Sequence, residues 1–239
     1  MIPKIIHFCW HGKDKMPELA ERCIASWHKL MPDYEYKLWN EDVFDVNSVP
    51  YTKEAYEAGK YAFVSDYVRL WALEREGGIY LDVDFEVYKP FDDLLSWKAF
   101  AGFEGSKHSP VMMGVIASEA HGNWVKEMLE AYQGRRFLKP NGLPDLTTNV
   151  QFLTARMREN GLVQNGIEQD YKDLHVFPVE YFCPRQTTGE YIRTENTYCE
   201  HLGLNSWTED TGGWKAQVAR VIGQKNMPRL IKLKRKLFG

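Results

Sequence analysis

Two carboxylates follow a short run of apolar residues in the first half of the chain. Asp82 and Asp84 come directly after Ile79-Tyr80-Leu81. If this run is a buried strand that continues through Asp84, the two side chains share a face, repel each other and resist desolvation. A hard divalent ion resolves that conflict, because Mg²⁺ and Mn²⁺ bind through one or two carboxylates together with substrate phosphates. Taken alone, an Asp-x-Asp triplet has a plainer interpretation, a solvated turn.

The predicted position of the pair favours a functional site. In open α/β sheets, ligands bind beyond the carboxyl ends of the strands, and Asp82 and Asp84 are expected there. A cation held by both carboxylates would neutralise the negative charge of a bound phosphate group.

The helix before this strand carries a second charged pair. Asp66 and Arg69 lie three residues apart, on one face of a predicted helix that ends at Gly77-Gly78. On an exposed helix such a pair is a surface ion pair that contributes little stability. The surrounding residues are apolar over much of the circumference, which indicates a mostly buried helix with an embedded polar pair. These residues are Ala62, Phe63, Val68, Leu70, Trp71 and Leu73.

Three segments resemble a known family. Residues 65–84, SDYVRLWALEREGGIYLDVD, resemble the sugar-nucleotide-binding region, with its DXD motif, of glycosyltransferase family 32 and of the related large clostridial glucosylating toxins. The family pattern is approximately S-D-x-x-R followed by G-G-x-Y-x-D-x-D, which the chain matches without a gap. Residues 2–10 (IPKIIHFCW) resemble the family's first strand, and residues 201–207 (HLGLNSW) are similar, more loosely, to its closing segment.

The resemblance implies a metal site. Asp82 and Asp84 would hold Mn²⁺ or Mg²⁺, and His201 or Ser206 would supply a further contact, since both lie in the segment that resembles the family's closing one. An ordinary, partly exposed histidine is the alternative for His201, although imidazole is an acceptable ligand for Mn²⁺.

The resemblance also implies roles at the nucleotide. Trp10 would stack on the uracil of a UDP-sugar, as its counterpart does in the clostridial toxins, and the alternative is a core tryptophan at a strand end. Trp207 could donate its indole N–H to a phosphate oxygen.

The remaining donor-site residues are expected at the sugar. Asp66 would accept hydrogen bonds from sugar hydroxyls, and Arg69 would place positive charge near the sugar or the diphosphate. Asn149 and Gln151 open a predicted helix and could face the sugar. Capping of that helix is the alternative for Asn149.

The order of predicted elements indicates the fold class. Strands are predicted at 4–10, 34–39, 79–84, 99–103 and 111–117, and helices at about 17–30, 52–58, 123–133 and 149–160, besides the one that ends at Gly77-Gly78. This order predicts an α/β sheet with helices on both faces. The resemblance implies the GT-A type, a Rossmann-like mixed sheet flanked by helices in a single domain. We expect a glycosyltransferase domain at 1–224 and a basic amphipathic tail at 225–239.

Composition limits the class of protein further. At 239 residues and 44% apolar content, the chain can bury the core of one larger domain, and its net charge of −3 gives no case for nucleic-acid binding. The four cysteines are widely spaced and are expected to be reduced thiols. No signal peptide or spanning segment is recognisable, so we expect a cytoplasmic protein.

The end of the chain has a different charge pattern from the rest. Basic residues interleave with apolar ones from Lys225 to Phe238, and no acidic residue follows Asp210. Such a segment can lie on an anionic membrane surface, on the inner face of the membrane in this case. A solvated helix or a frayed terminus is the alternative.

The residues and the resemblance together predict a metal-dependent glycosyltransferase, and the resemblance implies that it is retaining. It would move a hexose or hexosamine from a nucleotide sugar, a UDP-sugar, to a saccharide or lipid-linked glycan in bacterial surface polysaccharide synthesis. The alternatives are a toxin-like protein glycosyltransferase and a non-catalytic nucleotide-sugar-binding module. No carboxylate in the sequence can be assigned as a nucleophile. This favours a same-face substitution over a double displacement, and both mechanisms stay open.

Overall fold

The computed structural model describes residues 1–105, 109–185 and 190–203. Ser206, Trp207 and the tail at 225–239 lie outside the described residues, as does the expected boundary after residue 224. All described residues belong to one compact unit.

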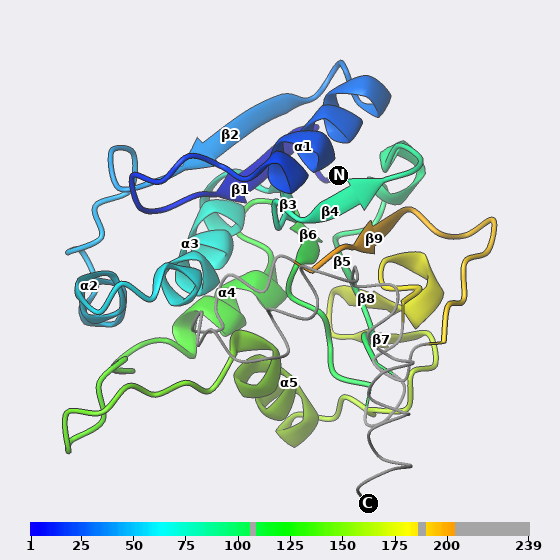
Figure 1. The fold of residues 1–239 in the computed structure, drawn as a ribbon. Coiled ribbons are helices and arrows are strands. Elements are labelled where there is room, and N and C mark those ends of the chain that lie inside the picture. Colours follow the sequence, from blue (N-terminus) through cyan, green and yellow to red (C-terminus); the bar gives the residue numbers. More distant parts are fainter. Residues whose placement is uncertain (106–108, 186–189, 204–239) are drawn as a thin grey trace, which may run out of the picture. The chain divides into compact units, whose positions relative to one another are not determined.

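A seven-stranded mixed sheet forms the centre of the protein (Figure 1). Strands β1 and β3 run parallel to β2, β5 runs parallel to β8, and β6 lies antiparallel between β3 and β5. The carboxyl ends of β1, β3 and β5 therefore meet at one edge of the sheet. In spatial order the strands are β2 (Glu35–Trp39), β1 (Ile5–Cys9), β3 (Gly78–Leu81), β6 (Val115–Ser118), β5 (Ala99–Gly102), β8 (Leu174–Phe177) and β7 (Gln169–Tyr171).

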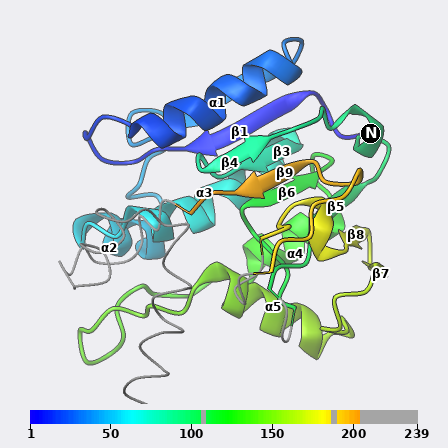
Figure 2. The ribbon, with the colours of Figure 1, turned by 45° about the vertical axis from the view of Figure 1, so that its right-hand side comes forward.

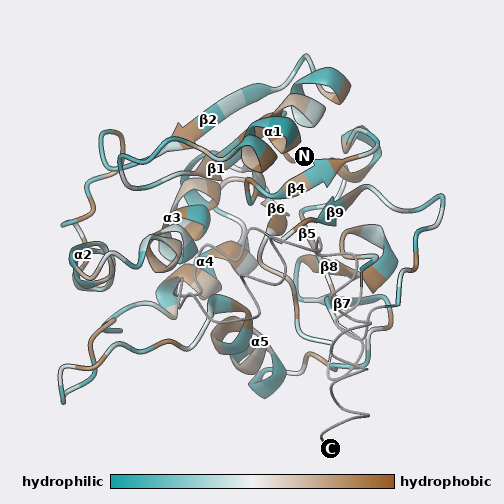
Figure 3. Cartoon of the chain, viewed as in Figure 1, coloured by the Kyte–Doolittle hydropathy of each residue, from teal (hydrophilic) through white to brown (hydrophobic). Residues whose placement is uncertain are grey.

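Helices cover both faces of this sheet, as Figure 2 shows. Helix α1 is amphipathic, with polar and apolar residues around its circumference (Figure 3), and packs Trp27 into the core on one face. The other four helices bury their apolar residues on the opposite face. The helices are α1 (Glu18–Leu30), α2 (Pro50–Glu57), α3 (Tyr61–Glu76), α4 (Asn123–Glu130) and α5 (Asn149–Glu159), with short 3-10 turns at Asp92–Leu94 and Val179–Tyr181.

Strand β3 alternates between the two cores. Ile79 and Leu81 join the core on the α1 face, whereas Tyr80 joins the core on the α3 face. Because side chains alternate along a strand, residue 82 continues on the side of Tyr80. This alternation directs Asp82 toward α3.

The helix-to-strand connection before β3 depends on two glycines. Gly77 and Gly78 have φ values of 66° and 110°, which disfavour any side chain. A Cβ at Gly78 would lie 2.7 Å from the Ile5 carbonyl oxygen, and one at Gly77 would lie 2.7 Å from the Ala120 nitrogen. The predicted helix stop at Gly77-Gly78 is confirmed, and the close approach holds β3 against β1.

The prediction of one strand over 79–84 is wrong. Strand β3 ends at Leu81, and the Asp82 carbonyl oxygen accepts a hydrogen bond from the Phe85 N–H at 3.1 Å, which closes a turn. The chain resumes as β4 (Phe85–Val87), which leaves the large sheet and pairs antiparallel with β9 (Cys199–His201). Asp82 is therefore the first residue of a turn and Asp84 the third, and the two do not lie on one face of a strand.

Other boundaries differ less. The predicted strand at 111–117 is observed as Val115–Ser118, and the predicted helix at 123–133 ends at Glu130. Strands β4, β7, β8 and β9 were not predicted. In the described part of the chain, no helix is long and apolar enough to cross a membrane.

Candidate active site

The charged pair of α3 is buried. Asp66 and Arg69 have 7% and 4% of their surface exposed, and Arg69 Nη2 donates to Asp66 Oδ1 at 3.2 Å. The predicted embedded pair is confirmed, and the surface ion pair is excluded. Buried charges of this kind must be paired and hydrogen-bonded to persist.

Arg69 is fixed by protein groups at each of its nitrogens. Its Nε donates to the Ser65 carbonyl at 3.1 Å, and its Nη1 donates to the Met113 carbonyl at 2.5 Å. Both of its terminal nitrogens also lie 3.3 Å from the carboxylate of Asp82. Arg69 therefore connects the helix carboxylate Asp66 to the carboxylate that follows β3.

The two carboxylates of the Asp-x-Asp segment have different partners. Asp82 accepts from Arg69 and from the Tyr80 hydroxyl at 2.8 Å, whereas Asp84 Oδ2 lies 3.0 Å from His201 Nε2. The pairing of β4 with β9 brings His201 opposite Phe85, and the two rings stack at 4.8 Å. Although they lie on a turn, the carboxylates still repel. Burial raises the pKa of Asp82, Arg69 lowers it, and the charge of Asp84 raises it further.

The start of α5 completes the surroundings of Asp66. The backbone N–H of Asn149 donates to the Asp66 carboxylate, and the Asn149 side chain is buried beside it. Burial raises the pKa of Asp66 to about 6, against the opposing charge of Arg69. Thr148 occupies the cap position of α5, since its hydroxyl accepts from the Gln151 N–H, whereas Asn149 is the first helical residue and its Oδ1 accepts the first-turn N–H of Val150 at 2.7 Å.

Trp10 lies at the same edge of the sheet, immediately after β1. It is half-buried against the core on the α1 face, and its indole N–H donates to the Asp14 carbonyl at 2.8 Å. The Trp10 ring therefore packs against the core on one side and stays partly exposed on the other. Behind it, His7 joins β1 to the glycine turn, because its Nε2 lies 2.8 Å from the Gly77 carbonyl oxygen.

Sequence comparison identifies the family. A family profile described as "Glycosyltransferase sugar-binding region containing DXD motif" matches residues 17–101. The uncharacterized glycosyltransferase L373 of Acanthamoeba polyphaga mimivirus is 32% identical over 221 residues, which cover 87% of this chain and 84% of that protein. The chain belongs to glycosyltransferase family 32.

Further relatives match a smaller part of the chain. Inositol phosphoceramide mannosyltransferase 3 of Schizosaccharomyces pombe is 36% identical over 103 residues, which cover 41% of this chain. The match spans 29% of that relative's own length. Among solved structures, the PaToxG glycosyltransferase superposes with a TM-score of 0.50 at 22% identity, covering 66% of this chain and 70% of that one. This likeness concerns the fold, and the sheet order agrees with the expected GT-A type.

The residues of this site suit a divalent cation. No three His, Cys, Asp or Glu side chains within residues 1–105, 109–185 and 190–203 converge to hold a metal ion by themselves. Asp82, Asp84 and His201 nevertheless supply hard oxygens and one imidazole within electrostatic range of one another. Two carboxylates with phosphate oxygens and water are a usual donor set for Mg²⁺. The residues present fit a metal that binds together with its substrate.

Glu104 is an acidic group of the site that the sequence analysis missed. It follows β5 as Asp82 follows β3, so both lie at the same edge of the sheet. Burial raises the pKa of Glu104, with His201 lowering it and Asp82 raising it. Burial also opposes protonation of His201, but the hydrogen bond to Asp84 and the carboxylates of Asp82 and Glu104 outweigh it, so the pKa of His201 is raised. A carboxylate directly after a predicted parallel strand was the signal available in the sequence.

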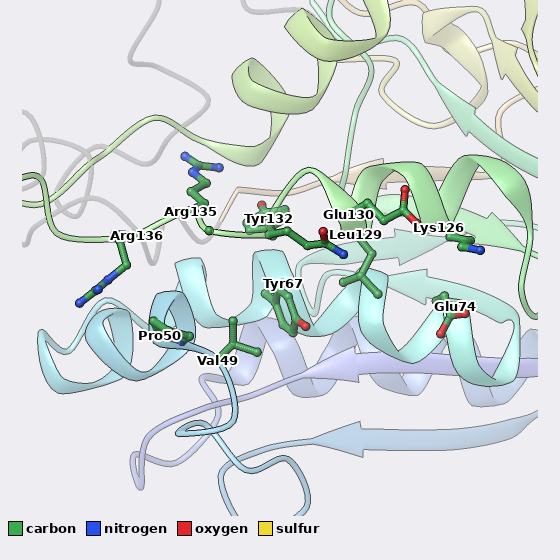
Figure 4. A pocket seen from close by; sticks show the side chains of 12 residues that line it. Val49, Pro50, Tyr67, Glu74, Lys126, Leu129, Glu130, Tyr132, Arg135 and Arg136 are labelled. Carbon is green, nitrogen blue, oxygen red and sulfur yellow. The ribbon is translucent and has the colours of Figure 1, made fainter.

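A pocket of about 330 Å³ lies between the start of α2, α3 and the end of α4 (Figure 4). Tyr67, Tyr132 and Arg135 line it, whereas neither Asp82 nor Asp84 does. The pocket is therefore distinct from the candidate metal position. Two of its lining residues, Tyr132 and Arg135, also lie within electrostatic range of Asp66.

Proposed function

We propose that this glycosyltransferase transfers a hexose or hexosamine, with retention and with a divalent cation, from a UDP-sugar to a saccharide or lipid-linked glycan. The setting that we propose is bacterial surface polysaccharide synthesis on the cytoplasmic side of the membrane. One observation carries the proposal: Arg69 links Asp66 and Asp82 in a buried network at the edge of the sheet where Asp84 also contacts His201.

In the reaction, the bond between the sugar and the diphosphate breaks and negative charge collects on the leaving phosphate. Mn²⁺ or Mg²⁺ held by Asp82 and Asp84, with His201, would neutralise that charge as a Lewis acid. Asp66 accepts hydrogen bonds from sugar hydroxyls, and Arg69 holds both Asp66 and Asp82 in position. Because all three nitrogen atoms of Arg69 already have protein partners, we assign it a positioning role and not a direct contact with the diphosphate.

The carboxylates of this network support a same-face substitution. A nucleophile for a double displacement needs a carboxylate oxygen aimed at the anomeric carbon. The carboxylate of Asp66 accepts from Arg69 and from the Asn149 backbone, and that of Asp82 accepts from Arg69 and Tyr80. Both are committed to hydrogen bonds that orient them, which favours direct attack by the acceptor while the leaving phosphate receives its proton.

A second candidate concerns the sugar and the acceptor. Two of the relatives are named inositol phosphoceramide mannosyltransferase 3 and mannosyl phosphorylinositol ceramide synthase SUR1. These names favour mannose, itself a hexose, and a lipid acceptor. The toxin-like alternative is supported by the fold that the chain shares with the PaToxG glycosyltransferase.

A panel of nucleotide sugars tests the proposal without an acceptor. We expect the purified protein to hydrolyse one of UDP-glucose, UDP-N-acetylglucosamine, UDP-galactose and GDP-mannose when Mn²⁺ or Mg²⁺ is added, and to stop when EDTA is added. Asp84→Asn should abolish hydrolysis, because it weakens the ion's anchor, and should change thermal stability little, because relief of the repulsion with Asp82 offsets the weaker contact with His201. Glu86→Gln, two residues further on β4, is the matched control and should stay active. Activity of Asp84→Asn in EDTA would refute metal dependence.

Trp10 is tested by its effect on donor binding. If its ring stacks on the base, Trp10→Ala should raise the donor KM more than it lowers kcat, because stacking is felt alike in the ground and transition states. A large loss of kcat at unchanged donor affinity would assign Trp10 to the core alone. The proposed phosphate contacts of Ser206 and Trp207 lie outside the described residues and stay predictions.

The proposed membrane contact depends on the tail at 225–239, which also lies outside the described residues. The full chain should co-sediment with anionic vesicles at low salt and less at high salt, because salt screens the attraction. A chain that ends at Lys225 should bind more weakly and still hydrolyse the donor. Equal binding by both chains would refute the membrane role.

A further inference from the structure

Buried polar atoms without hydrogen-bond partners gather in one region of the protein. In the described part of the chain, five buried side-chain nitrogen or oxygen atoms lack a partner. One is His11 Nε2, and the other four are the hydroxyls of Tyr51 and Tyr132, Nη1 of Arg135 and Nδ2 of Asn149. Native proteins leave few such atoms, and each one calls for an explanation.

These four side chains belong to residues that lie near Asp66. The rings of Tyr51 and Tyr132 pack edge to face at 5.1 Å, and the guanidinium carbon of Arg135 lies 5.1 Å and 5.3 Å from their centres. The carboxylate of Asp66 acts electrostatically on both tyrosines and on Arg135, and it accepts the backbone N–H of Asn149. Residues from α2, from the segment after α4 and from the start of α5 therefore meet beside Asp66. We call Tyr51, Tyr132, Arg135 and Asn149 the open polar cluster.

The protein holds Arg135 in place from outside this cluster. Its Nη2 donates to Asp145 Oδ2 and to the Thr147 carbonyl, both at 3.2 Å, and its guanidinium lies 3.9 Å from the ring centre of Phe152. The position of Nη1 is thus set by contacts that do not satisfy Nη1 itself. Such preorganisation reduces the entropy lost when a ligand binds.

The adjacent backbone is fixed by a buried carboxylate on α2. Glu54 accepts the N–H groups of Phe137 and Leu138 at 2.9 and 3.1 Å, and it also pairs with Arg136. Arg135 and Arg136 consequently extend in different directions from one segment, as Figure 4 shows. Only Arg136 reaches Glu54, and Arg135 is left for the open polar cluster.

The chemistry of the cluster selects its ligand. Arg135 and Asn149 offer N–H donors, the two tyrosine hydroxyls donate or accept, and Asp66 accepts. A free anion is disfavoured, because the carboxylates of Asp66 and Asp145 lie beside Arg135. A ring with several neighbouring hydroxyls, each of which donates and accepts, matches both the donors and the carboxylate.

We propose that Tyr51, Tyr132 and Arg135 bind hydroxyls of the donor's sugar ring beside Asp66 and Asn149, and so determine which sugar the protein accepts. This inference rests on the proposed function, since it takes the sugar of the nucleotide donor as the ligand. It adds three specificity-determining residues to the site.

The test compares nucleotide sugars with the same nucleotides lacking the sugar. Binding of UDP, GDP, UDP-glucose and GDP-mannose is measured by calorimetry with Mn²⁺ for the wild type, Tyr51→Phe, Tyr132→Phe and Arg135→Lys. Each phenylalanine variant should weaken binding of the preferred nucleotide sugar by about 3- to 10-fold, and Arg135→Lys by about 10-fold or more, as expected for losing neutral and charged hydrogen bonds. Binding of the matching diphosphate should change less than about twofold in all three, because its contacts lie elsewhere.

Thermal stability separates a binding role from a structural one. The hydroxyls of Tyr51 and Tyr132 make no hydrogen bond, so both phenylalanine variants should melt at or above the wild-type temperature. Tyr171→Phe is the matched control, because its hydroxyl contacts Glu127 at 3.2 Å. It should lose stability and leave sugar binding unchanged.

Three results would count against the inference in different ways. Unchanged sugar affinity in the phenylalanine and lysine variants would overturn it while leaving the proposed function intact. Loss of stability in the phenylalanine variants, similar to that of Tyr171→Phe and with unchanged sugar binding, would instead assign the hydroxyls to ordered internal water. Failure of the wild type to bind any diphosphate or nucleotide sugar would refute the proposed function itself.

Discussion

Two groups of buried polar side chains lie next to each other in this protein, and they differ in how their hydrogen bonds are satisfied. Between α3 and β3, Asp66, Arg69 and Asp82 satisfy one another, with help from backbone carbonyls and Tyr80. In the open polar cluster, four equally buried atoms have no partner. Burial alone therefore does not distinguish a structural polar group from one that awaits a ligand.

The difference has an energetic consequence. A buried charge whose partner is removed keeps its desolvation penalty, so the satisfied group resists any single change. Removing an atom that has no partner breaks no hydrogen bond in the unliganded protein, so the free energy of unfolding does not fall. Substitutions in the first group should thus reduce stability, whereas substitutions in the second should reduce ligand binding.

The largest effect should come from Arg69→Met. It leaves Asp66 and Asp82 buried without their cation, and we expect the free energy of unfolding to fall by about 3–5 kcal/mol. Arg75→Met on the same helix is the control. Arg75 is exposed and lies over the Trp71 ring at 4.6 Å, so its loss should cost less than about 1 kcal/mol. Chemical denaturation measures both, and equal losses would contradict the view that the α3 network is a closed unit.

The next effect should come from Glu54→Ala, which releases the segment that carries Arg135. The buried N–H of Phe137 and the N–H of Leu138 lose their acceptor, and we expect a loss of about 1–3 kcal/mol together with weaker sugar binding. Glu57→Ala lies one turn later on α2 and has an exposed side chain 3.9 Å from Lys53. It should stay within about 0.5 kcal/mol of the wild type. Sugar affinity that survives Glu54→Ala would show that Arg135 does not depend on this anchor.

A pair of identical substitutions compares the two groups directly. Tyr80→Phe removes a hydroxyl that donates to Asp82, and should lower the free energy of unfolding by about 1–2 kcal/mol. Tyr132→Phe removes one without a partner, and should not lower it. Equal losses in thermal unfolding would mean that the Tyr132 hydroxyl has a partner in solution, such as ordered water.

A pH dependence is also expected from Asp66. Its pKa of about 6 in the folded protein is above its usual 3.8, so the folded state binds this proton more tightly than the unfolded chain. The contribution to stability is therefore full below the lower value and is lost as the pH rises toward about 6. Denaturation of the wild type and of Asp66→Asn between pH 4 and 7 should show the wild type losing stability relative to the variant across that window. Parallel curves would place the titration of Asp66 outside it.

The spacing of nearby residues predicted much of the group formed by Asp66, Arg69 and Asp82. Asp66 and Arg69 share a helix face because they are three residues apart, and the two glycines end the helix because of their backbone freedom. Apolar neighbours on the same helix indicated its burial. The carboxylate after β3 followed from the rule on strand ends, and the same rule applied to 99–103 would have found Glu104.

The sequence analysis predicted only one residue of the open polar cluster, Asn149. Tyr51, Tyr132 and Arg135 look like ordinary aromatic and basic residues, and only the start of α5 had been predicted near the sugar. The assumption of a straight strand through Asp84 failed because a single backbone hydrogen bond from Phe85 to Asp82 closes a turn that no pattern of apolar residues shows.

The sequence by itself determined the family, the fold class, the buried Asp66–Arg69 pair and the approximate place of Asp82, because helix and strand periodicity fix which nearby residues share a face. Only the tertiary structure decided that Asp84 meets His201, 117 residues later, and that residues with unpaired polar atoms from three segments meet near Asp66. Such long-range contacts depend on how helices and strands pack against one another, and the spacing of residues along the chain does not predict that packing.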